Sequence, residues 1–356
     1  MAFLCLYSPE KHNRFYKTQA YIFYCVFIIL VPLLAILYLL LEEEIDIVEI
    51  NYNAAFLSQT TCFITKLLPF VTNIDQIRKC IHYFGDPNFK AHNDGEKKII
   101  DDCVRICRRN STAFLIGVTG GVFIWDIKPL FGKDYALPIE VWLPFNPKGE
   151  LKTYYCVYLF LALAVVYVAL AGTMVDPLIG GLACHAAGQL KILKNNLQHL
   201  DNYTEEERLS RNKNTKNRII YYKIKQCIDR HNAILNFAKE FEECFSWVVF
   251  SQFAASSFAI CFCILQLSAN ELTSINAVSS LLCVFIVLGE IYFYCYYGTM
   301  LLEENNSLTN AIYMGNWYEY NAKSRKSLIT LMERSKRPMI ITAGKLLDLS
   351  LETFTM

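Results

Sequence analysis

Long apolar stretches alternate with polar, charge-rich ones along this chain of 356 residues. A helix crosses the hydrocarbon core of a bilayer with about 20 mainly apolar residues. Stretches of near that length predict seven membrane-spanning helices, the last of them incomplete: 19–41, 54–74, 111–131, 153–178, 244–269, 275–302 and 338–356. The pattern therefore predicts an all-α membrane protein with seven transmembrane helices.

The helical pattern continues beyond several of these stretches. Apolar residues keep a helical period after residue 178, resume at Ile219, and run on from the sixth stretch through Ile312. A further amphipathic helix is predicted at 317–337. Apolar stripes of this kind must be buried, either against one another or also against a neighbouring subunit, and their number favours the second arrangement.

The predicted helices divide the chain into membrane regions and a cytoplasmic anchor bundle. Transmembrane helices one to four, with the region of a ligand pocket, are expected in 1–178, and helices five and six in 244–302. The cytoplasmic extensions of helices four and five are expected in 179–243, an anchor helix in 303–337, and the start of helix seven in 338–356.

The distribution of positive charge predicts the orientation in the membrane. Lys and Arg accumulate in cytoplasmic loops. Most of the 34 Lys and Arg residues lie before the first stretch and after the second, fourth and sixth, whereas the loops between have few. The N-terminus is therefore expected in the cytosol, the reverse of a G-protein-coupled receptor. Residues 1–18 are charged, and the apolar run after them is too long for a cleavable signal peptide.

The overall composition agrees with the prediction of a membrane protein. Hydrophobic residues make up 54% of the chain and charged residues 19%, and the net charge of +1 comes without a basic arm, so no nucleic-acid partner is expected. The 14 cysteines avoid the loops predicted outside, where disulfides would form. Cys103 and Cys107 lie one helical turn apart, but no second pair or nearby histidine completes a zinc site. We expect no metal and no cofactor, and catalytic motifs such as the P-loop are lacking.

Several passages in a fixed order resemble the insect odorant receptor family. They are "CIDRHNAILNFAKEFEECFSWVVFSQFAASSFAIC" at 227–261, the passage from "YCYYGTMLLEENN" to "LSLETF" at 294–354, and "LPFNPK" before the fourth stretch. The run Asp176, His185 and Gln189 after that stretch adds to the likeness. It covers essentially the whole chain and is strongest from residue 219 onward, although no single short motif carries it.

The resemblance implies an odorant-gated, non-selective cation channel of four subunits around one pore. A tuning subunit of this kind works with the conserved odorant co-receptor in a heterotetramer, in the plasma membrane of olfactory sensory neurons. Its ligand is a small volatile odorant, and its surroundings are membrane lipid. Family members generally continue past the point where this sequence stops, so the resemblance implies that the seventh helix is incomplete here.

The closing segment "RPMIITAGKLLDLSLETFTM" is predicted to line the pore. Read as a helix, it places Lys345, Asp348, Glu352 and Thr355 on one face. Each charge would cost about 2.5–3.5 kcal/mol against lipid, so the stripe is expected to face water. We assign Asp348, Glu352 and Thr355 to the pore, where carboxylates favour cations. Alternatively the charges, Lys345 above all, lie below the membrane and are solvated there.

A pocket for apolar odorants should be apolar and aromatic with few polar groups. Gly121 and Trp125 lie one turn apart, with Val118 a turn before, and small residues beside a large ring leave space. Gly117 and Gly121 equally fit close helix packing. The full set of candidate ligand-binding residues, each of which could instead belong to the core, is Thr60, Phe63, Ile64, Leu67, Val118, Gly121, Trp125, Tyr158, Leu159, Ala162, Leu282, Phe285 and Gly289.

One acidic residue, Glu290, lies inside the apolar run "VFIVLGEIYFYCYYG". Acids within a membrane are candidates for function, but Glu290 could also hydrogen-bond within the bundle, and a structural role is favoured. Three functions compete with the odorant-gated channel: a G-protein-coupled chemoreceptor, a transporter and a related gustatory-type channel. The charge pattern opposes the first, and the second lacks internal repeats or broken helices.

Overall fold

The computed structural model describes residues 14–42, 47–72, 74–131, 136–147, 149–201, 213–269 and 275–355. Residues 1–13, which carry part of the N-terminal charge, and Met356, the last residue of the predicted seventh helix, lie outside the described residues. The chain is mainly helical and divides into two compact units. The first unit comprises Met1–Asn73, Asn110–Leu178 and Val248–Tyr292, and the second comprises Ile74–Arg109, Ile179–Trp247 and Phe293–Met356.

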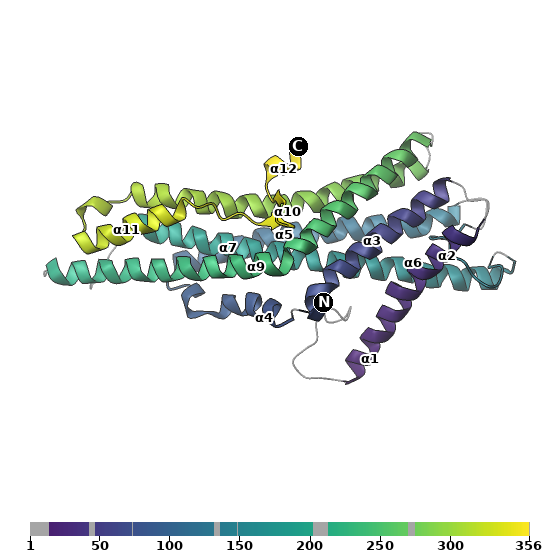
Figure 1. The fold of residues 1–356 in the computed structure, drawn as a ribbon, viewed down its shortest axis with the longest axis horizontal. Coiled ribbons are helices and arrows are strands. Elements are labelled where there is room, and N and C mark those ends of the chain that lie inside the picture. Colours follow the sequence, from purple (N-terminus) through teal and green to yellow (C-terminus); the bar gives the residue numbers. More distant parts are fainter. Residues whose placement is uncertain are drawn as a thin grey trace. The chain divides into compact units, whose positions relative to one another are not determined.

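The first unit is a bundle of apolar helices. Helices α3 and α6 lie side by side in it, and α2 packs on α3 (Figure 1). Its elements are α1 (Arg14–Phe23), a π-helical segment (Tyr24–Leu30), α2 (Val31–Leu41), α3 (Ile47–Thr72), the later part of α5 (Asp94–Ile127), a 3-10 turn (Lys128–Phe131), α6 (Leu151–Thr173), the start of α7 (Val175–Gln198), the later part of α9 (Lys213–Ala269) and the first part of α10 (Ile275–Tyr313).

Within the described residues, five helical stretches are long and apolar enough to cross a membrane. They are Tyr21–Leu41, Asp94–Leu130, Leu151–Gln198, Thr215–Ser268 and Ala277–Tyr313. A sixth is counted when Glu49–Phe70 and Ile74–Gly85 are taken together as one broken span. These stretches cover the first six predicted segments, so the chain has an all-α, multi-pass membrane fold.

Aromatic packing closes the core of the first unit. The ring of Tyr167 on α6 lies 5.4 Å from that of Phe23 and 5.3 Å from that of Phe27, measured between centroids. Phe63 of α3, only 1% exposed, meets the same tyrosine edge-on. Rings from α1, the π-helical segment and α3 therefore meet around Tyr167 of α6 and join these elements.

The fourth predicted segment is not one continuous helix. Helix α6 ends at Thr173 and α7 begins at Val175. Pro177 lies in the first turn of α7, where its missing N–H cannot bond to the carbonyl of Thr173, four residues before. A proline in the first turn is tolerated because that donor would be unpaired anyway. The chain therefore changes helix next to Asp176, a residue of the polar cluster described below.

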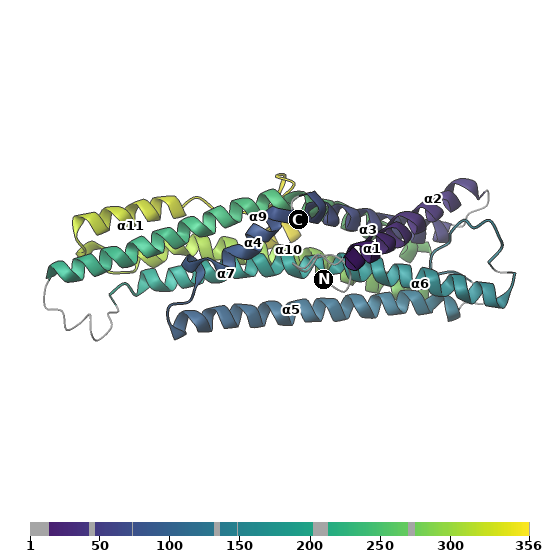
Figure 2. The ribbon, with the colours of Figure 1, turned by 90° about the horizontal axis from the view of Figure 1, so that it is seen from below.

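The second unit contains the remaining parts of the long helices together with short elements. Helix α11 lies beside α9 (Figure 2), with the Lys323 ammonium 4.2 Å from the ring centroid of Tyr221. Besides the parts of α5, α7, α9 and α10, the elements are α4 (Ile74–His82), 3-10 turns at Tyr83–Gly85, Pro87–Phe89 and Trp317–Glu319, α11 (Ala322–Ser335), β1 (Thr342–Ala343), β2 (Leu347–Asp348) and α12 (Leu351–Thr355).

A buried ion pair organises the second unit. Arg230 and Glu96 are 4% and 2% exposed, and their closest charged atoms lie 3.5 Å apart. The guanidinium also donates to the backbone carbonyls of Asn88 (2.8 Å) and Lys90 (2.9 Å). Arginine suits this position because its planar fork can satisfy several acceptors at once.

Helix α5 begins seventeen residues before the predicted start of the third segment, at Asp94 rather than 111. The Asn93 side chain accepts a hydrogen bond from the Glu96 N–H (2.7 Å), and the Glu96 carboxylate accepts one from the His92 N–H (2.9 Å). These reciprocal bonds satisfy donors at the helix start in the manner of a capping box. The polar sequence before residue 111 therefore continues the helix instead of forming a loop.

The predicted helix over 338–356 is wrong for most of its length. Residues 342–348 form a two-stranded antiparallel hairpin with Thr342 opposite Asp348, and a helix begins only at Leu351. Gly344 and Lys345 have φ values of 62° and 59°, which suit a tight hairpin turn and cannot occur within a right-handed helix. The turn is held to α9, because Ser246 O accepts from the Gly344 N–H at 2.9 Å. Asp348 consequently lies on a strand and not on a helix.

A close backbone approach fixes this closing segment against α10. A Cβ added to Gly298 would collide with the carbonyl oxygen of Leu349. The hydroxyl of Thr299 accepts a hydrogen bond from the Leu351 N–H at 2.8 Å. Glycine at 298 therefore permits the contact that places the start of α12.

We predict that Gly298→Ala displaces the closing segment and lowers the melting temperature of the detergent-purified protein by several degrees, since backbone overlap cannot be relieved by a side-chain rotation. Gly289→Ala is the matched control, because it lies on the same helix and no atom lies within 4 Å of its added Cβ. Equal melting temperatures for the two variants would contradict the close approach.

Candidate functional site

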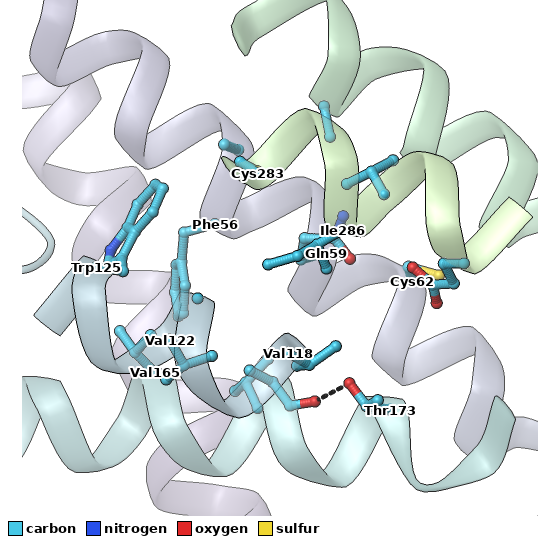
Figure 3. Close-up of a pocket in the computed structure, with 18 of the residues that line it drawn as sticks. Phe56, Gln59, Cys62, Val118, Val122, Trp125, Val165, Thr173, Cys283 and Ile286 are labelled. Atoms are coloured by element: carbon cyan, nitrogen blue, oxygen red, sulfur yellow. Dashed lines mark hydrogen bonds between the residues drawn. The ribbon is translucent and has the colours of Figure 1, made fainter. Parts of the chain in front are cut away.

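The first unit contains a cavity of about 180 Å³ between α3, α5, α6, α9 and α10. Figure 3 shows side chains from these helices pointing into it. On each helix the lining residues recur at three or four positions, so each presents one face. They are Ala55, Phe56, Gln59, Cys62, Phe63 and Lys66 of α3; Val118, Gly121, Val122, Ile124 and Trp125 of α5; Val165, Val168, Ala169, Gly172 and Thr173 of α6; Ala259 of α9; and Ser279, Leu282, Cys283, Ile286, Val287 and Glu290 of α10.

Part of the cavity is aromatic and apolar. The ring of Trp125 lies across from Phe56, with Val122 and Val165 near them (Figure 3). The indole N–H of Trp125 donates to the carbonyl of Pro138 at 3.3 Å. That bond fixes the ring against the segment that joins α5 to α6, so the large aromatic wall has a defined position.

The glycines of α5 differ in what surrounds them. A Cβ added to Gly121 would collide with the end of the Ile286 side chain on α10, whereas one added to Gly117 or Gly120 meets no atom within 4 Å. Of the predicted glycine pair, only Gly121 therefore lies against another helix. It does so at the cavity wall, where the end of the Ile286 side chain occupies the place that a side chain at 121 would take.

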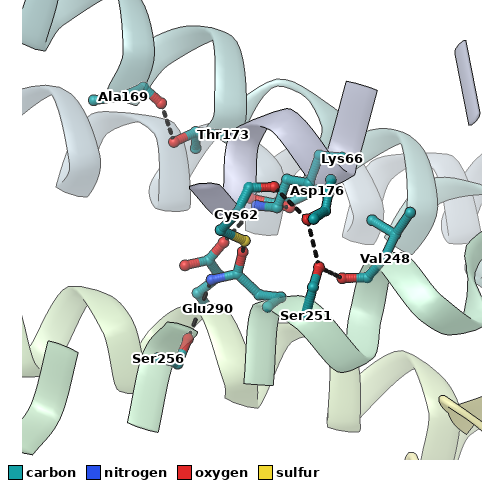
Figure 4. Close-up of polar contacts among 11 residues, drawn as sticks. Cys62, Lys66, Ala169, Thr173, Asp176, Val248, Ser251, Ser256 and Glu290 are labelled. Atoms are coloured by element: carbon teal, nitrogen blue, oxygen red, sulfur yellow. Dashed lines mark hydrogen bonds and ion pairs between the residues drawn. The ribbon is translucent and has the colours of Figure 1, made fainter. Parts of the chain in front are cut away.

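A buried ionic cluster lies at another part of the cavity wall (Figure 4). The Lys66 ammonium donates to Asp176 at 2.7 Å and to Glu290 at 2.9 Å. Residue exposures are 3% for Lys66, 0% for Asp176 and 8% for Glu290. A charge inside a membrane protein is tolerated when it is paired and kept from lipid, and here three helices supply the partners.

Neutral polar groups extend this cluster. The thiol of Cys62 donates to the side-chain oxygen of Gln252 at 2.8 Å, and Gln252 donates to the hydroxyl of Ser256 at 3.1 Å. Thr65 and Ser251 share a hydrogen bond of 2.6 Å. These bonds connect α3 with α9 (Figure 4), so the polar contacts are concentrated where α3, α7, α9 and α10 meet.

Five of the thirteen predicted ligand-binding residues line the cavity: Phe63, Val118, Gly121, Trp125 and Leu282. The other eight do not. Ile64, Leu159 and Phe285 are 42%, 62% and 69% exposed in the single chain. Thr60 is buried and donates to the carbonyl of Phe56 in its own helix, and Tyr158 donates to the carbonyl of Asp126. Leu67 and Ala162 pack on the core, and Gly289 has no atom within 4 Å of an added Cβ.

These differences arise from the rotation of the helices. A shift of one residue turns a helical position by about 100°. On α10 the cavity face contains Leu282, Ile286 and Glu290 instead of Phe285 and Gly289. The sequence pattern did not select Gln59, Cys62 or Lys66 either, although a lone lysine within the apolar run "CFITKLLPF" is a signal that could have identified the cluster.

The predicted pore residues occupy the closing segment of the second unit. Glu352 and Thr355 are exposed on α12, and Asp348 is exposed on β2. The hydroxyl of Ser350 accepts a hydrogen bond from the Thr353 N–H at 3.1 Å and so caps the start of α12. The structure thus places Glu352 and Thr355 on one short helix and Asp348 on the strand before it.

Taken together, the apolar spans and the cavity between them define a multi-pass, all-α membrane protein with a cavity among its helices. The family described as 7tm Odorant receptor matches residues 46–356, and the chain belongs to that family. It is therefore an odorant receptor by family, a class of receptors and not of enzymes.

Similar proteins agree with this assignment. The chain is 21% identical to Odorant receptor Or1 of Anopheles gambiae over 375 aligned positions, which cover 100% of this chain and 89% of that protein. It is 24% identical to Odorant receptor 23a of Drosophila melanogaster, over 87% and 79% of the two chains. The solved structure of the insect olfactory receptor OR5 from Machilis hrabei in complex with eugenol matches with a TM-score of 0.83 at 16% identity, over 99% of this chain and 92% of that one. At this level of sequence identity, the match to the OR5 structure shows that the two chains share a fold.

We predict that Lys66→Met strongly destabilises the protein, because it leaves Asp176 and Glu290 close together without their cation. Breaking a buried ion pair costs about 3–5 kcal/mol, which thermal unfolding in detergent would detect. Adding Asp176→Asn and Glu290→Gln to Lys66→Met removes the unpaired charges and should restore most of that loss. A single Lys66→Met variant as stable as the exposed-site control Lys323→Met would contradict the pairing.

Proposed function

We propose that this chain is a tuning subunit of an odorant-gated, non-selective cation channel, and that it binds a small volatile molecule in the cavity between α3, α5, α6 and α10. The observation that carries the proposal is a mainly apolar cavity between the helices of the membrane unit, in a protein from the odorant receptor family. That the similar OR5 structure is a complex with eugenol supports a small-molecule site in this fold.

The cavity suits a small ligand. Its volume of about 180 Å³ is below the ~300–1,000 Å³ of pockets for drug-sized molecules. A ligand of about ten non-hydrogen atoms at roughly 0.5 kcal/mol per atom would gain about 5 kcal/mol. The sensitivity of such a receptor is modest, and its selectivity comes from the shape set by Trp125, Phe56 and Gly121.

The closing segment is the proposed pore wall. Glu352 and Thr355 on α12 are exposed in the single chain. In a ring of four subunits, one carboxylate from each would attract cations. We propose that the conserved co-receptor supplies the other subunits, that the N-terminus is cytosolic, and that the channel works in the plasma membrane of olfactory sensory neurons.

Electrical recording tests the function itself. The full chain is expressed with and without the co-receptor in a cell that lacks odorant receptors, and odorant-evoked current is measured while G-protein signalling is blocked. A rapid cation current that persists under the block is expected. A response that disappears with the block would instead select a G-protein-coupled chemoreceptor.

The cavity assignment makes a further prediction about selectivity. Gly121→Ala adds a methyl group against Ile286, and one methylene in an apolar pocket changes binding by about 1–3 kcal/mol. We expect the half-maximal concentration of the bulkiest active odorant to rise at least about tenfold, with a smaller effect on smaller odorants. Gly117→Ala, one turn away and facing open space, should leave both responses unchanged. Equal effects of the two variants would contradict the site.

A further inference from the structure

Three thiols meet in the second unit, where α5 lies against α7 (Figure 2). Cys103 and Cys107 lie one turn apart on α5, and Cys184 lies on α7. The Cys184 thiol interacts with both thiols of α5 and donates to the backbone carbonyl of Cys103 at 3.6 Å. A thiol is a weak donor, so this contact matters mainly because it places the Cys184 sulfur beside residue 103.

Glycines on either side of Cys184 bring the two helices close together. Gly181 and Gly188 lie three residues before and four residues after it, so they share its face of α7. A Cβ added to Gly188 would lie 3.1 Å from the Cys103 sulfur and 3.5 Å from the Cys103 Cβ. One added to Gly181 would lie 3.6 Å from the Cys107 sulfur. A disulfide joins Cβ atoms about 3.5–4.5 Å apart, and a close approach of this kind is what such a bond between two helices requires.

The thiols differ in their access to solvent. Cys103 is half-buried, whereas Cys184 is only 1% exposed. The surrounding sequence of α5, "DGEKKIIDDCVRICRRN", is polar and precedes the apolar stretch predicted to cross the membrane. A water-soluble oxidant therefore reaches Cys103 before Cys184. In the proposed orientation this part of α5 is cytosolic, and disulfides in the cytosol are usually transient or redox-sensing.

We propose that Cys103 and Cys184 form a reversible redox modification site. Hydrogen peroxide oxidises Cys103, and Cys184 then closes a disulfide that links α5 to α7. The inference goes beyond the proposed function and does not depend on which molecule the receptor binds.

The reaction balances with peroxide as the oxidant. The Cys103 sulfur attacks one peroxide oxygen, so that an S–O bond forms and the O–O bond breaks, and the departing hydroxide takes up the thiol proton as water. The Cys184 sulfur then attacks the sulfenic acid, so that the S–S bond forms, the S–O bond breaks and a second water leaves. The two sulfurs lose two electrons and peroxide gains them. A small intracellular thiol reverses the modification by thiol–disulfide exchange.

Mass spectrometry tests the site directly. The full chain is purified with the co-receptor under reducing conditions and treated with increasing hydrogen peroxide. The remaining thiols are then alkylated before digestion. The expected product is a cross-linked pair of peptides containing Cys103 and Cys184, which dithiothreitol separates. Oxidation of Cys103 to the sulfinic acid without a cross-link, or no oxidation of Cys103, would overturn the inference.

The chain contains an internal control for access. The thiols of Cys80 and Cys244 also interact with each other, but these residues are 0% and 5% exposed. They should stay unlinked at peroxide concentrations that link Cys103 to Cys184. Equal oxidation of the two pairs would contradict the role given to the accessible thiol.

Substitutions separate the three thiols. Cys107→Ser removes a half-buried thiol one turn from Cys103 and should leave the cross-link intact, whereas Cys103→Ser should abolish it. In the wild-type chain, peroxide should raise the melting temperature by several degrees, because a cross-link restrains the unfolded chain, and dithiothreitol should reverse the rise. An equal rise in Cys103→Ser, or a cross-link from Cys107 to Cys184 in the wild-type chain, would overturn the assignment of Cys103.

Discussion

The structure of the first unit depends on the pairing of charge where water is scarce. Lys66, Asp176 and Glu290 come from positions far apart in the sequence, and each would be strongly unfavourable in lipid by itself. Together they form two ion pairs of 2.7 and 2.9 Å. Because loss of Lys66 would leave two carboxylates without their cation, α3, α7 and α10 are held at one point, and the cavity wall is built on these helices and their neighbours.

The cavity follows from the same packing. Helices that meet at a polar cluster need not pack tightly along their whole length. Where α5 contacts α10, the residue on α5 is Gly121, which has no side chain. Gly121 admits the Ile286 side chain of α10, and the indole of Trp125 is fixed by its bond to the carbonyl of Pro138. A fixed aromatic wall at one part of the cavity and the ionic cluster at another give the cavity both shape and polarity, which are the features expected of a site for a small molecule.

The sequence predicted the spans well, because hydropathy over some twenty residues averages out local detail. It also identified the family, and through Trp125 and Gly121 part of the cavity wall. Local geometry was predicted less well. The break at Pro177 and the hairpin at Gly344 and Lys345 depend on a few backbone angles that hydropathy does not record. The cavity faces of α3 and α10 differ from the predicted ones by about one residue, and a single apolar helix contains no signal for its rotation. Lys66 could have been recognised, but its partners lie on other helices.

The central claim is that the ligand of this receptor binds in the cavity of the first unit. Photolabelling tests it most directly, with a diazirine derivative of an odorant that opens the channel and with mass spectrometry to locate the adducts. Labelling that the parent odorant suppresses is predicted on the lining residues Gln59, Trp125 and Ile286. Suppressible labelling confined to residues of the second unit would contradict the claim.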